Sequence, residues 1–143
     1  MPYEYLEDVA IADIAFRAWA PDLAGVFLAA ADATLNVMIE DLDTIRLVEA
    51  RPVSLRNDTL DMLLFGLLQE IIYYKDAELL LLRLREARIE QKDGIWTLDG
   101  VARGERLDLE RHAQRVDVKA VTLYRFALEQ TEHGWEARVI LDV

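Results

Sequence analysis

The chain has 143 residues, a length that fits one compact unit, and we expect a single domain over residues 1–143. Its 27 acidic residues against 16 Lys and Arg give a formal net charge of −11, which repels a phosphate backbone and argues against direct binding to nucleic acid. The chain has no cysteine, which excludes disulfides and thiolate metal sites, and its N-terminus lacks the regions of a signal peptide. These features predict a cytoplasmic protein.

The first third of the chain predicts strands on both sides of a helix. Residues 3–6 are aromatic-rich and residues 12–20 alternate apolar with polar side chains, so both read as strands. Apolar side chains then recur at helical spacing over residues 23–38. Another strand is expected over residues 44–55, at the edge of its sheet because Pro52 cannot donate a ladder hydrogen bond.

A second helix, "TLDMLLFGLLQEIIYY", is apolar almost all round and follows Asn57 and Asp58, either of which can cap it. At roughly 16 residues it falls short of the ~20 needed to cross a bilayer, so we expect a core helix and no membrane association. The residues predicted to line the interior are Leu64, Leu67, Leu68, Ile71 and Ile72.

The second half of the chain consists of alternating segments separated by turn signals such as Lys92-Asp93-Gly94 and His133-Gly134, which is typical of an antiparallel meander. One expected strand is "VKAVTLYRFALEQ" and the last is "GWEARVILD". Two early helices and many late strands predict the α+β class, with two main helices packed on largely antiparallel β-sheets.

Residues able to carry out catalysis are scarce. There is no phosphate-cradling glycine loop and no nucleophile elbow, and the only serine, Ser54, lies in a predicted strand. His133 precedes a glycine in a predicted turn, which indicates a solvated position. His112 is expected at the polar surface, where we retain it as a candidate for a partner interface.

Two aspartates form a candidate metal site. Asp13 lies on the more polar face of its strand, and Asp142 lies on the more polar face of the last strand. If these strands are neighbours, the two carboxylates meet beside the terminal carboxylate or main-chain carbonyl of Val143. Such an all-oxygen set suits Ca²⁺, Mg²⁺ or Mn²⁺. The alternative is two unrelated, solvated aspartates.

Several blocks of the sequence, taken in order, resemble one family. They are "YEYLE" with "ADIAFRAW", an alanine-rich helix ending in Val37 and Met38, "LLFGLLQEIIYYKDAE", "GERLDLERH", "VKAVTLYRF" and the terminal "VILDV". Together they span essentially the whole chain and are similar to the archease family.

The resemblance implies an accessory protein rather than an enzyme. Archeases are described as helpers of the RtcB-type RNA ligase, which joins RNA ends in tRNA splicing or RNA repair using GTP and manganese. They promote guanylylation of the ligase and multiple turnover, with a divalent cation held by acidic residues. The positions that match are Asp13, Asp142 and the main chain or carboxylate of Val143. His112 and Lys119 are the candidate contacts to the ligase, although Lys119 also fits a lysine that blunts a sheet edge.

The chain departs from the family pattern at two histidines. Ala10 and Ile11 stand where many members have His-Thr, and Asp8 is a possible functional substitute. After the retained Lys-Ala-Val-Thr block at residues 119–122, Tyr124 stands where a histidine is often found.

Two other functions fit the sequence. One is a divalent-metal-dependent hydrolase of small phosphoesters that uses the same aspartates. The other is an acidic chaperone or scaffold for basic proteins. The sequence leaves open the identity of the metal, whether the protein delivers metal or rearranges the ligase, the RNA substrates and the oligomeric state.

Overall fold

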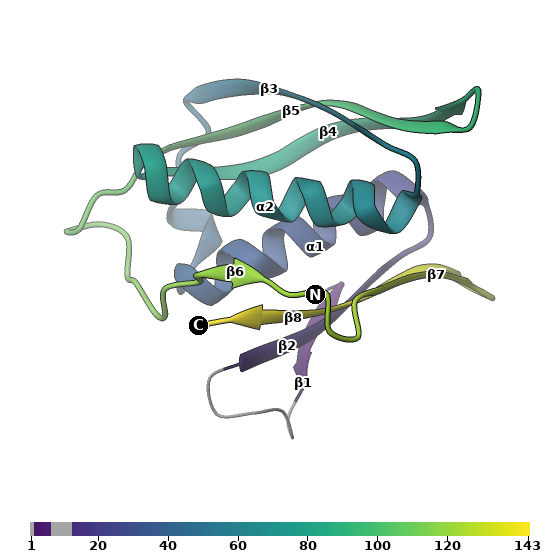
Figure 1. Cartoon of the computed structure of the whole chain (residues 1–143). Coiled ribbons are helices and arrows are strands. Elements are labelled where there is room, and N and C mark those ends of the chain that lie inside the picture. The colour runs from purple at the N-terminus through teal and green to yellow at the C-terminus, as the bar shows by residue number, and fades with distance from the viewer. Residues whose placement is uncertain (1, 7–12) are drawn as a thin grey trace.

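The computed structural model describes residues 2–6 and 13–143. Within them, two long helices lie between two antiparallel sheets, one above and one below the helices in Figure 1. This arrangement confirms the expected α+β class.

The first sheet contains both ends of the described chain. Its members are β1 (Tyr3–Leu6), β2 (Asp13–Ala20), β6 (Ala120–Val121), β7 (Ala127–Thr131) and β8 (Gly134–Asp142). The order is β1-β2-β8-β6, and β7 pairs with β8 on the same edge as β6. The expectation of one continuous strand over "VKAVTLYRFALEQ" is therefore wrong, because a turn at residues 123–126 divides it.

The second sheet has the order β3-β5-β4, with β3 (Glu49–Asn57), β4 (Leu80–Lys92) and β5 (Ile95–Arg106). Pro52 lies on the edge strand, as predicted. The strand begins later than expected because a short 3-10 turn, η1 (Leu42–Thr44), comes first. The Asp41 carboxylate stabilises that turn by accepting a hydrogen bond from the Asp43 N–H at 2.9 Å.

The two helices begin and end for local reasons. Helix α1 (Leu23–Met38) follows Asp22, whose carboxylate accepts the Gly25 N–H at 2.7 Å. Helix α2 (Leu60–Glu78) follows Thr59, so the expected cap at Asn57 or Asp58 is wrong. It runs past the predicted end and stops at Leu79, which has the left-handed φ of 53° typical of a helix terminus.

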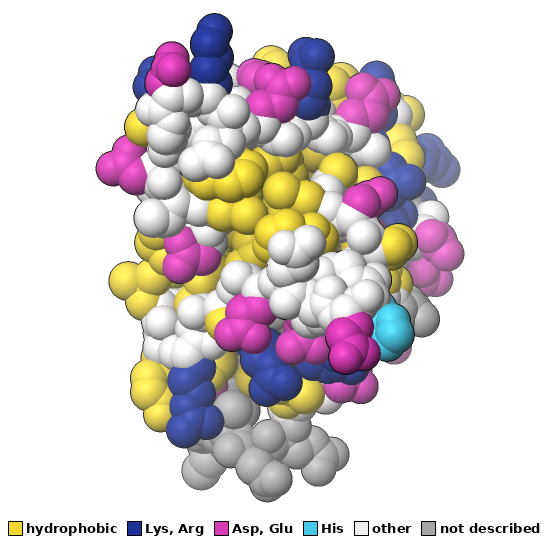
Figure 2. Space-filling model, turned by 90° about the vertical axis from the view of Figure 1, so that its right-hand side faces the viewer, with side chains coloured by type: hydrophobic (Ala, Val, Ile, Leu, Met, Phe, Trp, Pro, Cys, Tyr) yellow, Lys and Arg dark blue, Asp and Glu magenta, His cyan; other side chains and the backbone are white. Residues whose placement is uncertain are grey.

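The helix layer forms the core. Helix α1 packs against β2 and β4, and α2 packs against β4 and β3, so each sheet buries one face on the helices. The five residues predicted to line the interior are buried: Leu64, Leu67, Leu68, Ile71 and Ile72. None of the described helices is long and apolar enough to span a bilayer. Where the sandwich is seen end-on in Figure 2, hydrophobic side chains show between two bands of mixed charge.

Candidate metal site

Asp13 and Asp142, here called the aspartate pair, lie directly opposite each other in the ladder between β2 and β8. Residues facing each other in an antiparallel ladder have Cα atoms about 4.5–5.5 Å apart and side chains on the same face. The two carboxylates therefore emerge side by side and are partly exposed. The structure brings the two predicted residues together as the sequence suggested.

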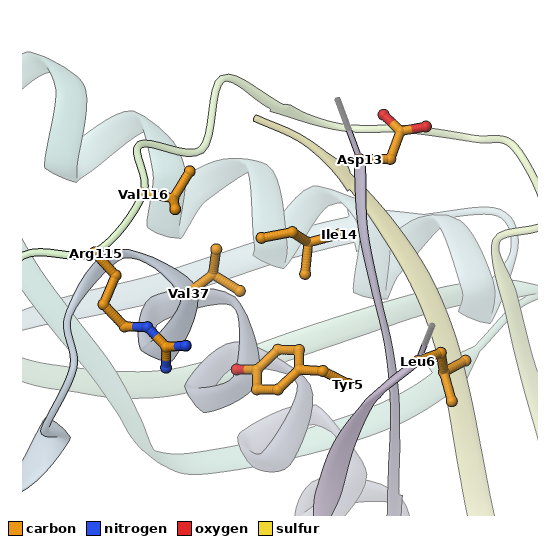
Figure 3. A pocket seen from close by; sticks show the side chains of 7 residues that line it. All are labelled: Tyr5, Leu6, Asp13, Ile14, Val37, Arg115 and Val116. Atoms are coloured by element: carbon orange, nitrogen blue, oxygen red, sulfur yellow. The ribbon is translucent and has the colours of Figure 1, made fainter. Parts of the chain in front are cut away.

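The alternation of β2 directs the aspartate pair away from the core. Figure 3 shows Ile14 pointing toward Val37 of α1, while the carboxylate of Asp13, one residue earlier, points away from the other labelled side chains. Those side chains and Asp13 line a hollow of about 270 Å³. In it, the Tyr5 hydroxyl donates a part-buried hydrogen bond to the Ala33 carbonyl at 2.7 Å, and the loss of solvent around the hydroxyl raises the pKa of Tyr5. Asp13 therefore borders the hollow, while its carboxylate points away from the other side chains that line it.

A second like-charged pair lies on the same two strands. Arg17 and Arg138, here called the arginine pair, also face each other across β2 and β8. Glu136 bridges them, accepting from Arg17 at 2.5 Å and from Arg138 at 3.3 Å, and Glu4 accepts from Arg17 at 3.1 Å. The two guanidinium groups, that of Arg17 first, lower the pKa of Glu136. Protein side chains therefore compensate the repulsion between the arginines.

The aspartate pair has no such compensation from the part of the chain that the structure describes. None of the ion pairs found among residues 2–6 and 13–143 involves Asp13 or Asp142. Within the same residues, no group of three or more His, Cys, Asp or Glu side chains is placed to hold a metal. Two carboxylates facing solvent suit a hard cation that keeps water and takes other oxygen ligands from the main chain.

The remaining residues of the predicted site lie beside the pair. Val143 follows Asp142 and packs against the core. The Lys119 N–H donates to the Asp142 carbonyl at 2.8 Å, and the residue is exposed next to the strand end. Asp8, Ala10 and Ile11 lie outside the described residues.

The expected surface position of His112 is wrong, because this residue is only 2% exposed. Its Nδ1 accepts the Asp108 N–H at 2.8 Å, which leaves the proton on Nε2 to donate to Glu105 at 3.0 Å. Both ring nitrogens are therefore used inside the protein, and the imidazole is not accessible to a partner.

Sequence reasoning missed the group around Glu105, here called the Glu105 cluster. Arg111 donates to both carboxylate oxygens at 2.6 Å, and the Arg46 N–H donates to Oε2 at 2.7 Å. Arg111 is the main cause, ahead of the Arg46 and His112 hydrogen bonds, of a Glu105 pKa lowered to about 2. The cluster ties the segment after η1 to the end of β5. The block "GERLDLERH" contains its acid and both bases, but no periodicity in that block indicates that they fold back on one another.

Comparisons with known proteins agree with this architecture. Residues 3–143 match the model of the Archease protein family. The protein archease of Methanosarcina acetivorans is 37% identical over 142 residues, covering 99% of this chain and 95% of the relative. That of Methanopyrus kandleri is 33% identical over the full length of both chains.

Solved structures give the same result. The solution structure of Methanobacterium thermoautotrophicum protein 1598 has a TM-score of 0.85 and 32% identity over 99% of both chains. A Thermotoga maritima crystal structure, described as an archease and possible chaperone, has a TM-score of 0.54 at 16% identity, covers 96% of this chain and 97% of its own, and supports the fold alone. On the family match and the close relatives together, this chain belongs to the archease family.

Proposed function

We propose that this archease is a non-catalytic accessory protein that binds a divalent cation and activates an RtcB-type RNA ligase. In this proposal it promotes guanylylation of the ligase and repeated turnover during tRNA splicing or RNA repair. Family membership supports the accessory role, and the aspartate pair supports the cation.

The observation that carries the proposal is the contrast between two like-charged pairs on one pair of strands. Glu136 bridges the arginine pair, whereas no cationic side chain among residues 2–6 and 13–143 forms an ion pair with Asp13 or Asp142. Like charges directly opposite in a ladder repel. A bound Ca²⁺, Mg²⁺ or Mn²⁺ would neutralise that repulsion, with Asp13 and Asp142 as ligands and Val143 offering a main-chain or carboxylate oxygen.

The charge of the protein suits a ligase as the partner. A protein that binds RNA carries a basic cleft, and complementary potentials speed encounter and orient the two surfaces. With a formal charge of −11, the accessory protein is attracted to such a cleft and repelled by RNA itself. Lys119, exposed beside Asp142, is a candidate contact at the edge of this surface.

A phosphoester hydrolase receives less support from the same face. Hydrolysis at a metal needs groups that hold the phosphate, and the arginine pair is the nearest candidate on these strands. Arg17 is already engaged by Glu4 and Glu136, and Arg138 by Glu136. Both guanidinium groups therefore already have carboxylate partners on the sheet face and are not free to bind a phosphate.

The test is a guanylylation assay with the RtcB-type ligase of the same organism. Wild-type protein should increase guanylate transfer to the ligase, while Asp142→Asn should fail to do so and should lose cation binding in calorimetric titration with Ca²⁺ and Mn²⁺. Glu129→Gln is the matched control, since it neutralises an exposed carboxylate on β7 of the same sheet.

Three outcomes would contradict the proposal. An Asp142→Asn protein that stimulates the ligase like wild type would remove the role of the aspartate pair. Capture of many unrelated basic proteins, with no effect on the ligase, would favour a general chaperone. Submicromolar binding of the isolated protein to RNA at physiological salt would contradict a helper directed only at protein.

A further inference from the structure

The turn at Leu123–Phe126, here called the exposed turn, interrupts the edge of the first sheet. The Thr122 N–H donates to the Ile140 carbonyl at 3.0 Å, and Ala127 pairs with Arg138. Four residues therefore lie opposite the single β8 position between those two, and they must leave the ladder. Their path is closed by a hydrogen bond from the Phe126 N–H to the Leu123 carbonyl at 3.1 Å.

The turn exposes large apolar side chains that a soluble surface does not need. Leu123 is 61% exposed and Tyr124 is 63% exposed. Arg125 has a φ of 55°, a left-handed conformation that costs a residue with a side chain roughly 1–2 kcal/mol. Exposed apolar area and backbone strain at one place together indicate a segment shaped by something other than stability.

The exposed turn is firmly held despite its exposure. Phe126 turns inward and packs edge-on against Phe65 of α2, with ring centroids 5.4 Å apart. Ladder contacts of β6 and β7 hold both flanks on β8. A binding element that is ordered before contact loses little entropy when it binds, so the turn is preorganised to present Leu123 and Tyr124.

The position and chemistry of the turn select a protein partner. The turn begins directly after Thr122, which lies opposite Ile140, two residues from Asp142, so a surface that covers the turn lies near the strand end that carries the aspartate pair. Leu123 has no group that recognises a base or a phosphate, and the Arg125 guanidinium lies 5.1 Å from the centroid of the Tyr124 ring, over a face that a base would need for stacking. Tyr and Arg are side chains enriched among residues that dominate protein interfaces.

From these observations we infer that the exposed turn is an anchor that inserts Leu123 and Tyr124 into an apolar recess of the partner ligase, beside the surface that meets the aspartate pair. The inference rests on the proposed function. It separates two tasks, with the turn supplying affinity and the aspartate pair supplying cation-dependent activation.

The test compares the Leu123→Ser/Tyr124→Ser double variant with wild type in binding to the ligase and in calorimetric titration with Ca²⁺. The double variant should bind the ligase about tenfold or more weakly, with Ca²⁺ affinity and unfolding midpoint unchanged. Val48→Ser is the matched control. Val48 is also an exposed apolar side chain, with 72% of its surface accessible, and it precedes β3 of the other sheet. This variant should bind the ligase like wild type.

Different failures are distinguishable. Equal ligase affinity of wild type and double variant would overturn the anchor and leave the proposed function standing. A loss of affinity in Val48→Ser as large as in the double variant would also overturn it, since any exposed apolar group would then suffice. No binding or stimulation by the wild type would overturn the proposed function and the anchor together. RNA binding by the wild type that the double variant loses would assign the turn to RNA and reject the inference.

Discussion

Strands β2 and β8 present two like-charged pairs on one face, and the protein treats them differently. At one end Arg17 and Arg138 face each other, and Glu136 accepts hydrogen bonds from both. At the other end Asp13 and Asp142 face each other, and no ion pair among the described residues involves either of them. The first pair is complete within the fold. The second has no ion-pair partner among residues 2–6 and 13–143, and this difference is the reason for proposing a cation there.

The Glu105 cluster is a second example of charged side chains that are satisfied within the fold. Its carboxylate accepts from Arg111, His112 and the Arg46 N–H, and Arg111 above all holds its pKa near 2. A buried group with that many partners has no acceptor capacity to offer a ligand. The His, Arg and Glu of this cluster therefore stabilise the fold, whereas the aspartate pair, which forms no ion pair among the described residues, is the site proposed for a cation.

The largest expected effect comes from the scaffold that both pairs share. Leu67→Ala should lower the free energy of unfolding by about 2–5 kcal/mol, because Leu67 is fully buried in α2 and its removal leaves a cavity. Denaturant unfolding measures the change. The extra stability given by Ca²⁺ should survive the substitution, so a variant that loses the cation effect as well would show that the core and the aspartate pair are coupled.

A bound cation should stabilise the folded protein, and this effect should depend on the aspartate pair. At a concentration about a hundred times its Kd, the cation should raise the free energy of unfolding by about 2.7 kcal/mol, because it binds the folded state. The increment, measured by denaturant unfolding with and without Ca²⁺ or Mn²⁺, should vanish in Asp13→Asn and persist in Glu129→Gln. An increment of the same size in Asp13→Asn would place the cation elsewhere.

Removing the bridge should convert the arginine pair into an uncompensated one. Glu136→Ala should cost about 1 kcal/mol, because the two guanidinium groups lose their common acceptor while remaining partly solvated. Since the folded pKa of Glu136 is lowered, its contribution is present above the ordinary carboxyl pKa and disappears as the pH falls through the lowered value. Unfolding midpoints at neutral and acidic pH test this, and an equal cost at both would exclude the bridge as its source.

The smallest expected effect comes from reversing one charge of the aspartate pair. Asp142→Lys should stabilise the metal-free protein by about 0.5 kcal/mol, because opposite charges facing each other in a ladder attract where like charges repel. The same variant should lose cation binding and ligase stimulation. A destabilised Asp142→Lys protein in metal-free buffer would mean that the two carboxylates do not repel each other in the native state.

Part of the fold was predictable because it depends on residues that are close together in the sequence. The helical spacing of α1, the nearly all-apolar α2 and the edge position of Pro52 each follow from the chemistry of neighbouring residues. The expected strand over "VKAVTLYRFALEQ" failed because its alternation continues through a turn, and only the pairing of β6 and β7 with different parts of β8 reveals the break.

The candidate site divides in the same way. The sequence by itself determined which face of its strand each aspartate occupies, because side chains alternate in any strand, and it identified the family through ordered blocks along the whole chain. Only the tertiary structure decided that Asp13 lies opposite Asp142, that His112 is enclosed by Glu105 and Asp108, and that the turn at Tyr124 is exposed. Ladder register, enclosure of a polar side chain and exposure of a turn are relations between segments far apart in the chain, and no local pattern encodes them.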